Sequence, residues 1–419
     1  MNVTAHRIRR IYLYLTLLIV FGFSAVQAAD TERLKKDVVP TFQSINLKID
    51  SRDSTYGGNV SMALTVKNPT SSFIFHAEDM TIVDAVMNGK EGEIKNTYVT
   101  GEHGRTTLTT NSPLNPGEYT LGISFTASFN TQAVGLYRTE SGGERYLFTQ
   151  FEESDARKAF PCFDEPAFKY PFQLTLTIPD EHIAISNTPI EIQTSSEGWT
   201  TMTFKKTEPL PSYLLAIAAG PLETVDVPDM PIPTRIICAK GKSNLTGETA
   251  KITPPLMAAM IKYFERPYPY EKLDLIAVPE FWAGGMENAG AITFRETVIL
   301  QDPNAISVGQ RLGLISTMSH ELAHMWFGDL VTMEWWDDLW LNESFASWMG
   351  DKIAQQEFPN LGIGVSTVES GLYAMVGDAR PTALAMRPPD SKTADLLSTI
   401  GAVYSKGQAI LLMIERWLG

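Results

Sequence analysis

The sequence predicts an α+β multi-domain protein, in which an N-terminal antiparallel, β-sandwich-like domain is followed by a mixed α/β domain. Three observations support this fold class. In the first half, apolar and polar residues alternate over short runs, which is the pattern of strands that bury one face. In the second half, the apolar residues follow a helical period. One of these predicted helices carries the pattern H-E-x-x-H at 320–324.

The composition is that of a globular protein. The chain has 419 residues, of which 44% are hydrophobic and 20% are charged, and this length suffices for two or three domains with large cores. The formal net charge of −14 argues against a nucleic-acid-binding protein, which needs a basic surface. A negative charge is compatible with a site that attracts amines, although most of the charged residues are expected to be solvated.

Residues 1–28 are predicted to be a secretory signal peptide. A cationic stretch at 6–10 precedes an apolar run at 11–23 and a small-residue cleavage pattern that ends at Ala28. The apolar run is shorter than the roughly 20 residues that span a bilayer, so cleavage is favoured over an uncleaved anchor. No later stretch of the sequence is long and apolar enough to span a membrane. We therefore expect export to the periplasm or the cell exterior, without membrane anchoring.

The chain has only two cysteines, Cys162 and Cys238, so its fold does not depend on a disulfide framework. One bridge between them is an alternative. We favour two unpaired, buried cysteines.

The first domain is predicted to cover 30–224 and to consist mainly of antiparallel strands. Met62, Leu64 and Val66 alternate with polar or small residues, and the runs at 119–125 and 172–178 follow the same period of two. Turn-forming residues separate these runs, as in N-P at 68–69, N-P-G-E at 115–118 and P-D at 179–180.

The second domain is predicted to cover 225–419, after a stretch at 225–233 that is rich in proline and acidic residues. Thr253 is expected to cap a helix with Pro254 in its first turn. Strands are expected at 273–278, 289–294 and 298–300, and helices elsewhere.

The last residues, 408–419, form a strongly apolar predicted helix. So large an apolar surface needs a partner. We expect either the core of the second domain or a further C-terminal domain, missing from this chain, to pack on it.

The H-E-x-x-H run predicts a metal site. Residues four apart on a helix lie on the same face, so His320 and His324 can bind one divalent ion, above all zinc, with Glu321 beside the water that the ion carries. Glu343 follows at a distance that allows a second helix to supply the third ligand. Gly328 is placed to end the first helix. The alternative is an amphipathic helix whose histidines are satisfied by hydrogen bonds.

Four sequence motifs of this chain resemble the motifs of a known protein family. They are G-G-M-E-N at 284–288, H-E-L-A-H at 320–324, W-L-N-E-S-F at 340–345, and the stretch 149–166, which begins T-Q-F-E and ends F-P-C-F-D-E-P. In order and spacing they resemble the aminopeptidase N family of zinc metallo-aminopeptidases. The likeness covers most of the chain after residue 28 and implies a thermolysin-like catalytic domain.

The resemblance also implies roles for individual residues. One zinc ion would be bound by His320, His324 and Glu343, with Glu321 as the general base. The substrate's free amine would be bound by Glu287 and Glu152. The remaining implied residues are Tyr404, which stabilises the transition state, and the substrate-binding residues Gln150, Gly284, Gly285, Met286 and Ala289.

The chain departs from the family pattern in three respects. Gly285 stands where alanine is commoner, and Ser344 stands where glycine is commoner. The family also adds helical domains after the catalytic one, whereas this chain ends shortly after Tyr404.

The predicted function is a zinc metallo-aminopeptidase that removes amino-terminal residues from peptides. A zinc endopeptidase is an alternative that would have no use for Glu287, and substrates with an acetylated amino terminus distinguish it. An epoxide hydrolase of the same fold needs a lipid epoxide assay. The third alternative, a truncated and catalytically inactive binding protein, is tested by metal analysis and turnover of aminoacyl arylamides.

Overall fold

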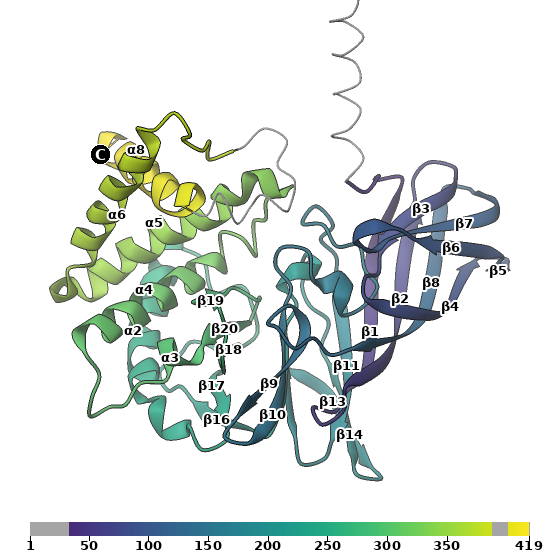
Figure 1. Ribbon diagram of the computed structural model, residues 1–419, viewed down its shortest axis with the longest axis horizontal. Helices are drawn as coiled ribbons and strands as arrows, with labels where there is room; N and C mark the ends of the chain where they lie inside the picture. Colours follow the sequence, from purple (N-terminus) through teal and green to yellow (C-terminus); the bar gives the residue numbers. More distant parts are fainter. Residues whose placement is uncertain (1–32, 388–400, 419) are drawn as a thin grey trace, which may run out of the picture. The chain divides into compact units, whose positions relative to one another are not determined.

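The computed structural model describes residues 33–387 and 401–418 (Figure 1). The predicted signal peptide lies outside the described residues. From Lys36 onward the chain forms one compact unit. Within the described ranges, none of the helices has the length and apolarity that a membrane crossing requires.

The N-terminal part is built on an eight-stranded sheet. All neighbouring strands in this sheet are antiparallel except β1 and β11, which are parallel. The predicted antiparallel β domain is therefore confirmed, with one parallel pair added. In spatial order the strands are β13 (Ile190–Ser196), β14 (Trp199–Phe204), β11 (Phe172–Pro179), β1 (Val38–Lys48), β2 (Thr55–Val66), β8 (Gly117–Ser128), β4 (Met80–Gly89) and β5 (Gly92–Ile94).

The alternation in the sequence matches the burial of these strands. Met62, Leu64 and Val66 of β2 are buried, whereas the residues between them are partly exposed. The apolar residues of β11 are buried in the same alternating manner. Burial of one face is what a period of two requires.

Two smaller sheets complete this part. One has three strands, β3 (Thr70–His76), β7 (Arg105–Leu114) and β6 (Asn96–Thr100). The other has four strands, β12 (Ile183–Ser186), β15 (Ile217–Gly220), β10 (Glu144–Gln150) and β9 (Gly135–Ser141). The second is important for function because the segment that follows β10 reaches the candidate site.

An ion pair fixes the segment that follows β10. Arg157 Nε lies 2.8 Å from Asp164 Oδ2, and these side chains are only 11% and 1% exposed. The Arg157 guanidinium also donates to the Asp164 carbonyl oxygen, and Ser212 Oγ donates to Asp164 Oδ1 at 2.5 Å. Every polar atom of the Asp164 carboxylate thus has a partner, which offsets the cost of burying its charge.

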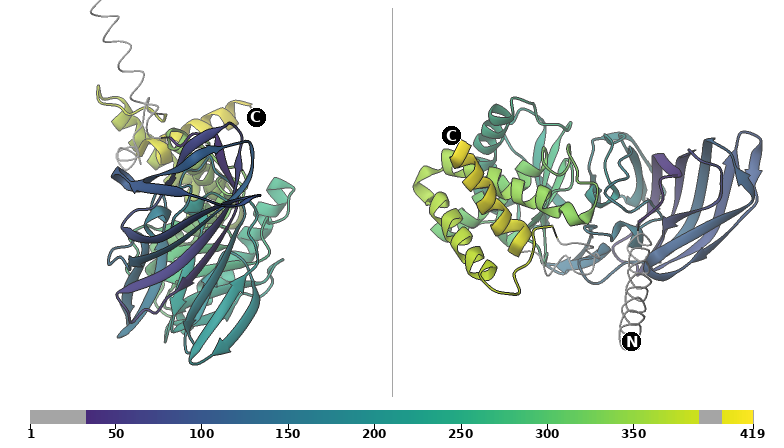
Figure 2. Two further views of the ribbon diagram at one scale, coloured as in Figure 1. Left: turned by 90° about the vertical axis from the view of Figure 1, so that its right-hand side faces the viewer. Right: turned by 90° about the horizontal axis from the view of Figure 1, so that it is seen from above.

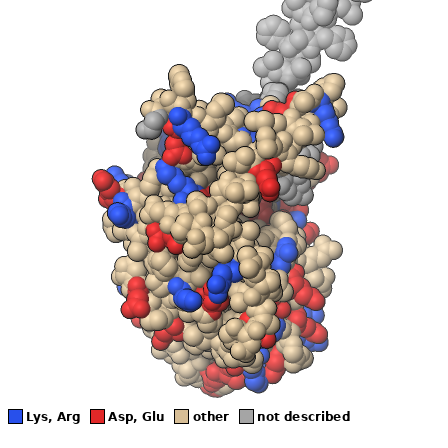
Figure 3. All heavy atoms as spheres, turned by 90° about the vertical axis from the view of Figure 1, so that its left-hand side faces the viewer, with Lys and Arg blue, Asp and Glu red and all other residues tan. Residues whose placement is uncertain are grey.

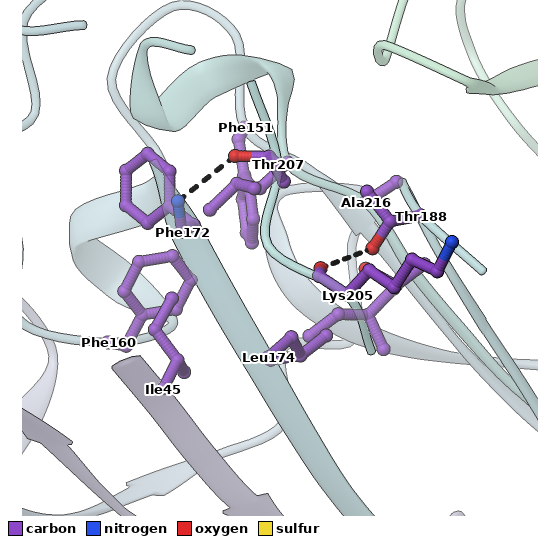
Figure 4. A pocket seen from close by; sticks show the side chains of 12 residues that line it. Ile45, Phe151, Phe160, Phe172, Leu174, Thr188, Lys205, Thr207 and Ala216 are labelled. Carbon is purple, nitrogen blue, oxygen red and sulfur yellow. Dashed lines mark hydrogen bonds between the residues drawn. The ribbon is translucent and has the colours of Figure 1, made fainter. Parts of the chain in front are cut away.

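Apolar side chains pack beneath the same segment. Phe151, Phe160 and Phe172 enclose a small cavity with Ile45 and Leu174 (Figure 4). Its volume is about 10 Å³, which is no more than one water molecule occupies. This cavity is therefore part of the core and is too small for a ligand.

The second part contains a five-stranded mixed sheet. Its three middle strands are parallel, and the two edge strands are antiparallel to their neighbours. In spatial order they are β16 (Leu222–Asp226), β17 (Thr234–Ala239), β18 (Leu273–Val278), β20 (Ala291–Arg295) and β19 (Gly285–Met286). Since β15 ends at Gly220 and β16 begins at Leu222, the change from one sheet to the next occurs a few residues before the predicted boundary at 224.

Helices pack against this sheet and against one another. They are α2 (Gly247–Phe264), α3 (Glu296–Ile299), α4 (Val308–His324), α5 (Leu339–Glu357), α6 (Ile363–Asp378) and α8 (Gly407–Leu418). Their shared core includes Leu256, Leu275, Leu314, Leu322 and Met349, all of which are fully buried. The combination of a β-rich part and this helical part confirms the α+β multi-domain fold class.

Three local predictions are wrong. The helix of His320 and His324 is α4, which ends at His324 with Met325 as its cap, so Gly328 does not end it. Helix α2 begins at Gly247, so Pro254 and Pro255 lie inside it instead of in its first turn, and Thr253 donates its hydroxyl to the Thr249 carbonyl instead of capping. Burial of the α2 apolar face outweighs the hydrogen bonds that the two prolines cannot donate. The apolar residues at 298–300 were expected in a strand, but the short helix α3 covers most of them.

Other predictions agree with the structure. Cys162 and Cys238 are both unpaired and buried, as favoured. The C-terminal helix α8 lies beside α5 and α6 (Figures 1 and 2). It buries Gly407 and Gln408 but leaves Trp417 and Leu418 83% and 74% exposed. The neighbouring helices therefore cover only part of its apolar surface.

The Arg157–Asp164 pair predicts a large stability effect. Asp164→Ala leaves a buried guanidinium without its carboxylate, and we expect it to lower the free energy of unfolding by about 3 to 5 kcal/mol. The matched control is Glu140→Ala, because Glu140 pairs with Arg145 at 2.9 Å on an exposed surface, where the expected loss is below about 1 kcal/mol. Urea denaturation of both variants measures the difference. Equal losses would contradict the assigned role of Asp164.

Candidate active site

Helix α4 carries the H-E-x-x-H run in the predicted manner. Ser307 caps its N-terminus in a reciprocal hydrogen-bonded box with Gln310. Its apolar face, including Leu314 and Met318, is buried in the core, and the helix ends at His324. This orientation turns His320 and His324 toward helix α5.

The two helices pack unusually closely at this point because α5 has a glycine there. A Cβ atom on Gly350 would lie 2.8 Å from the backbone nitrogen of His320 and 3.0 Å from its Cα atom. Any side chain at 350 would therefore push α5 away from α4. The close approach brings Glu343 on α5 next to the histidines of α4.

Three ligand atoms converge between the helices. His320 Nε2 lies 2.9 Å from His324 Nε2, and Glu343 Oε2 lies 3.2 Å from His320 Nε2 and 3.5 Å from His324 Nε2. Ligands that bind a tetrahedral ion such as zinc at about 2.0 to 2.1 Å are about 3.3 Å apart. The spacing and the donor set, two imidazoles and one carboxylate, therefore fit a metal ion of this kind.

The other ring nitrogens are held by groups that the sequence did not identify. His324 Nδ1 lies 2.9 Å from Asn342 Oδ1, and His320 Nδ1 lies 3.3 Å from Ser347 Oγ. Asn342 Nδ2 donates to Glu287 Oε1 at 2.8 Å, which directs the amide oxygen toward His324. In the neutral form of the His324 ring, this contact places the proton on Nδ1, which leaves Nε2 as the atom that can bind a metal.

Three aspartates that lie near these ligands in the sequence, Asp329, Asp337 and Asp338, do not contact the histidine rings through a hydrogen bond that the structure describes. Asp337 and Asp338 pair with Arg387 at 2.9 and 3.0 Å. The Asp329 carboxylate is buried without a hydrogen-bond partner in the part of the chain that the structure describes.

The charges at the site favour a bound cation. Burial would lower the pKa of His324, but the carboxylates of Glu287 and Glu343 outweigh it and raise this pKa well above its usual value. Burial would likewise raise the pKa of Glu343, but hydrogen bonds with His320 and His324 dominate and lower it. Buried carboxylates therefore outnumber the positive groups, an imbalance that a divalent ion removes.

Glu321 has an uncommitted carboxylate beside this centre. Its Oε2 atom is buried and has no hydrogen-bond partner among the described residues. Burial raises the pKa of Glu321 well above the usual range. A methyl group on Gly285 would overlap this carboxylate, so the glycine that departs from the family pattern gives Glu321 its room. A carboxylate in this position can accept and return a proton.

Glu287 and Glu152 form a second group of acids near the metal ligands. One carboxylate oxygen of each lies within 4.8 Å of the other and of a Glu343 oxygen. Glu152 Oε1 is buried and has no partner within 33–387 and 401–418, whereas Glu287 uses Oε1 to bind Asn342. Burial, followed by repulsion from Glu287, raises the pKa of Glu152 well above its usual value. Two acids this close can bind an ammonium group.

Gln150 and Met286 contact each other on the cleft wall. Gln150 Nε2 lies 3.4 Å from Met286 Sδ. Gln150 Oε1 is buried and accepts no hydrogen bond from the described residues. Met286 belongs to β19, an edge strand of the five-stranded sheet, and both residues of this strand line the cleft.

Tyr404 lies in a π-helical turn, η9 (Ala402–Lys406), that packs against α5. Its ring stacks on the His320 ring with centroids 5.8 Å apart. Ser344 donates its hydroxyl to the Val403 carbonyl, and a Cβ on Gly407 would overlap that hydroxyl. The serine that replaces the commoner glycine therefore ties the helix of Glu343 to the turn of Tyr404.

These groups line one cleft of about 590 Å³. Ten of the twelve predicted site residues line it, and Gly284 and Ala289 do not. Ala289 is buried, and its carbonyl accepts from Asn187 Nδ2 at 2.9 Å, so contact with the backbone of a substrate stays a prediction for Gly284 and Ala289. Cleft residues that the sequence did not assign include Glu153, Asp155 and Trp282.

Comparisons with known proteins agree with these motifs. A family model described as the peptidase family M1 domain matches residues 248–419, and the peptidase M1 N-terminal domain matches residues 39–214. Aminopeptidase M1-C of Oryza sativa subsp. japonica is 33% identical over 402 residues, which cover 94% of this chain and 46% of the relative.

Two further relatives come from distant organisms. Endoplasmic reticulum aminopeptidase 1 of Rattus norvegicus is 33% identical over 435 residues, which cover 97% of this chain and 47% of the relative. Aminopeptidase 2 of Candida albicans is 32% identical over 406 residues, which cover 94% of this chain and 44% of the relative. The chain thus spans about half the length of these relatives. On the two matched domains and their shared motifs, the chain belongs to peptidase family M1, the family of aminopeptidase N.

Proposed function

We propose that this chain carries the catalytic site of a zinc-dependent aminopeptidase, which hydrolyses the first peptide bond of peptides with a free amino terminus. One observation carries the proposal. Three metal-type ligands, an uncommitted carboxylate and a pair of amine-binding acids line the same cleft. Zinc is favoured among metals because two imidazole nitrogens and one carboxylate are its usual catalytic ligands. The relatives above, all named as aminopeptidases, support the same activity.

Glu321 acts as the general base and then as the general acid. When bound, a zinc ion polarises the substrate carbonyl and lowers the pKa of a coordinated water. Glu321 takes the proton of the attacking water on its free oxygen, and it passes this proton to the departing amine. The Glu321 carboxylate occupies space that a side chain at position 285 would take.

Tyr404 donates its hydroxyl to the carbonyl oxygen as negative charge develops there. Burial raises its pKa well above the usual value, so it remains a proton donor at neutral pH. Donors of this kind contribute about 3 to 4 kcal/mol to transition-state stabilisation. The Ser344 hydrogen bond to Val403 supports the turn that positions the ring.

Glu287 and Glu152 hold the substrate's ammonium group by charge-assisted hydrogen bonds. These acids lie within 4.8 Å of Glu343, so an ammonium bound to them would hold the first peptide bond of the substrate near the metal ligands. That arrangement favours an exopeptidase over an endopeptidase. Neither the epoxide hydrolase nor the inactive binding protein has a specific observation in its favour.

We also propose a protein partner for the terminal helix. Besides Trp417 on α8, helix α6 exposes apolar residues such as Leu372 and Tyr373. On this side of the molecule, acidic and basic side chains are interspersed with uncharged surface (Figure 3). A polypeptide domain equivalent to the part of the relatives that this chain does not match would cover that apolar surface. Export directed by residues 1–28 remains a further proposal, which rests on their sequence alone.

The role of Glu321 predicts a separation of metal binding from turnover. Glu321→Gln is expected to retain one zinc per chain and to lower kcat by about 10² to 10⁴, the usual contribution of a general base. Metal content and hydrolysis of alanyl arylamides measure the two properties. Glu357→Gln, at the C-terminal end of the same helix as Glu343 and outside the cleft, is the control and should not change either. Activity of Glu321→Gln within a few-fold of the unsubstituted protein would contradict the assignment.

The role of Glu287 predicts dependence on the substrate amine. Glu287→Gln keeps an acceptor for Asn342 but removes the charge, and we expect kcat/KM for free-amine substrates to fall about 10- to 100-fold. Acetylated substrates should not be cleaved by either protein. Efficient cleavage of acetylated peptides by the unsubstituted protein would instead indicate an endopeptidase.

The Asn342 hydrogen bond predicts an effect on metal affinity. Asn342→Ala leaves His324 Nδ1 without its side-chain acceptor, and metal affinity is expected to fall about 10- to 100-fold. Competition with a chelator measures this affinity. Asp338→Asn is the control, because Asp338 pairs with Arg387 instead of a ligand histidine. Equal losses in both variants would disprove the assigned role of Asn342.

A further inference from the structure

Glu153 is an acid on the wall of the cleft that has no role in the mechanism above. It directly follows Glu152 and lines the same cleft, where it is partly buried. It forms no ion pair within the described residues, whereas Lys158 Nζ lies 3.0 Å from Asp155 Oδ1. Burial and the nearby Asp155 raise the pKa of Glu153 to about 8, which is the behaviour of a carboxyl that lacks a cation.

Neither lysine nor arginine is present among the described residues that line the cleft, so no long cationic side chain of that part of the protein balances Glu153. A bound metal compensates Glu343, and a substrate ammonium compensates Glu287 and Glu152. Within 33–387 and 401–418, Glu153 still has no cation beside it after these groups are bound. A substrate with one more positive charge would supply it.

Gln150 provides a second, independent acceptor in the same cleft. Its side chain is only 3% exposed, and its Oε1 atom has no hydrogen-bond partner in the described chain. Contact of Nε2 with Met286 Sδ at 3.4 Å leaves the amide oxygen as the free atom. A buried carbonyl oxygen without a donor costs free energy, which a donor on a bound substrate would recover.

Apolar groups near these acceptors suit an alkyl chain. Trp282 lies on the cleft wall, and its Nε1 donates to the Ala133 carbonyl at 3.1 Å, which fixes the indole. Met286 contributes a flexible thioether to the same wall. Long basic side chains place their methylene groups on such surfaces and extend their charged ends to polar groups.

We propose that the cleft selects substrates whose first residue is lysine or arginine, with Glu153 and Gln150 Oε1 accepting hydrogen bonds from the charged end of that side chain. The inference rests on the proposed aminopeptidase function. The first residue is favoured over later ones because its side chain branches from the carbon that bears the ammonium. Glu152, which holds this ammonium, is the chain neighbour of Glu153.

The test compares lysine with norleucine, which has the same straight carbon chain without the ammonium. Aminocoumarin amides of both residues carry no second side chain, so they report on the first residue alone. We expect the full chain, loaded with zinc, to prefer lysine in kcat/KM by about 10-fold or more, as one charge-assisted hydrogen bond supplies. Glu153→Gln should reduce this preference about 10-fold and leave the norleucine value nearly unchanged.

Glu144→Gln is the matched control. Glu144 lies at the other end of strand β10, outside the cleft, so this variant removes one negative charge without changing the cleft wall. A similar reduction of the preference by Glu144→Gln would mean that overall charge acts, and it would overturn the proposal. Loss of Ala-Lys dipeptide hydrolysis in Glu153→Gln without a change for lysine amides would overturn it as well, because Glu153 would then bind the second residue.

A binding measurement separates this inference from the proposed function. Calorimetry with lysinamide and norleucinamide needs no turnover, and tighter binding of lysinamide that Glu153→Gln abolishes would support the role of Glu153 directly. Turnover of norleucine and lysine substrates at equal rates would refute the selectivity and leave the aminopeptidase intact. Absence of turnover for every arylamide would refute the proposed function instead.

Discussion

The close packing of helices α4 and α5 is the constraint on which the candidate site depends. Gly350 allows the α5 backbone to approach His320, and this approach sets the distance from Glu343 to both histidines. The same helix carries Asn342, which orients His324, and Ser344, which holds the turn of Tyr404. A small change in helix separation would therefore disturb a candidate metal ligand, its supporting hydrogen bond and the turn that carries Tyr404 together.

Hydrogen bonds connect the metal centre to the acids that would hold the substrate amine. Asn342 accepts from His324 and donates to Glu287, so one amide joins a candidate metal ligand to a residue that we propose to bind the amine. Glu152 reaches the same place from the N-terminal β part, on a segment that the buried Arg157–Asp164 pair holds in place. The proposed recognition of the amine would thus require both parts of the chain, since neither one supplies both acids.

Much of this arrangement could be predicted from the sequence, and the remainder depends on tertiary contacts. The alternation of apolar and polar residues predicted the strand around Met62, and the spacing of four residues predicted that His320 and His324 share one helix face. Both predictions succeeded because these patterns are local. The start of α2 was missed because packing of its apolar face overrides its two prolines. The partner of His324 was missed because Asn342 is distant in sequence, and only the folded chain distinguishes it from the nearby aspartates.

X-ray absorption spectroscopy of the zinc-loaded protein tests the central claim most directly, because it reports the ligands of the metal itself. The account predicts one zinc ion per chain, with two imidazole nitrogens and carboxylate or water oxygens at about 2.0 to 2.1 Å. It also predicts loss of one imidazole from the spectrum when His324 is replaced by alanine. A zinc ion without imidazole ligands, or a spectrum that is unchanged by this substitution, would contradict the account.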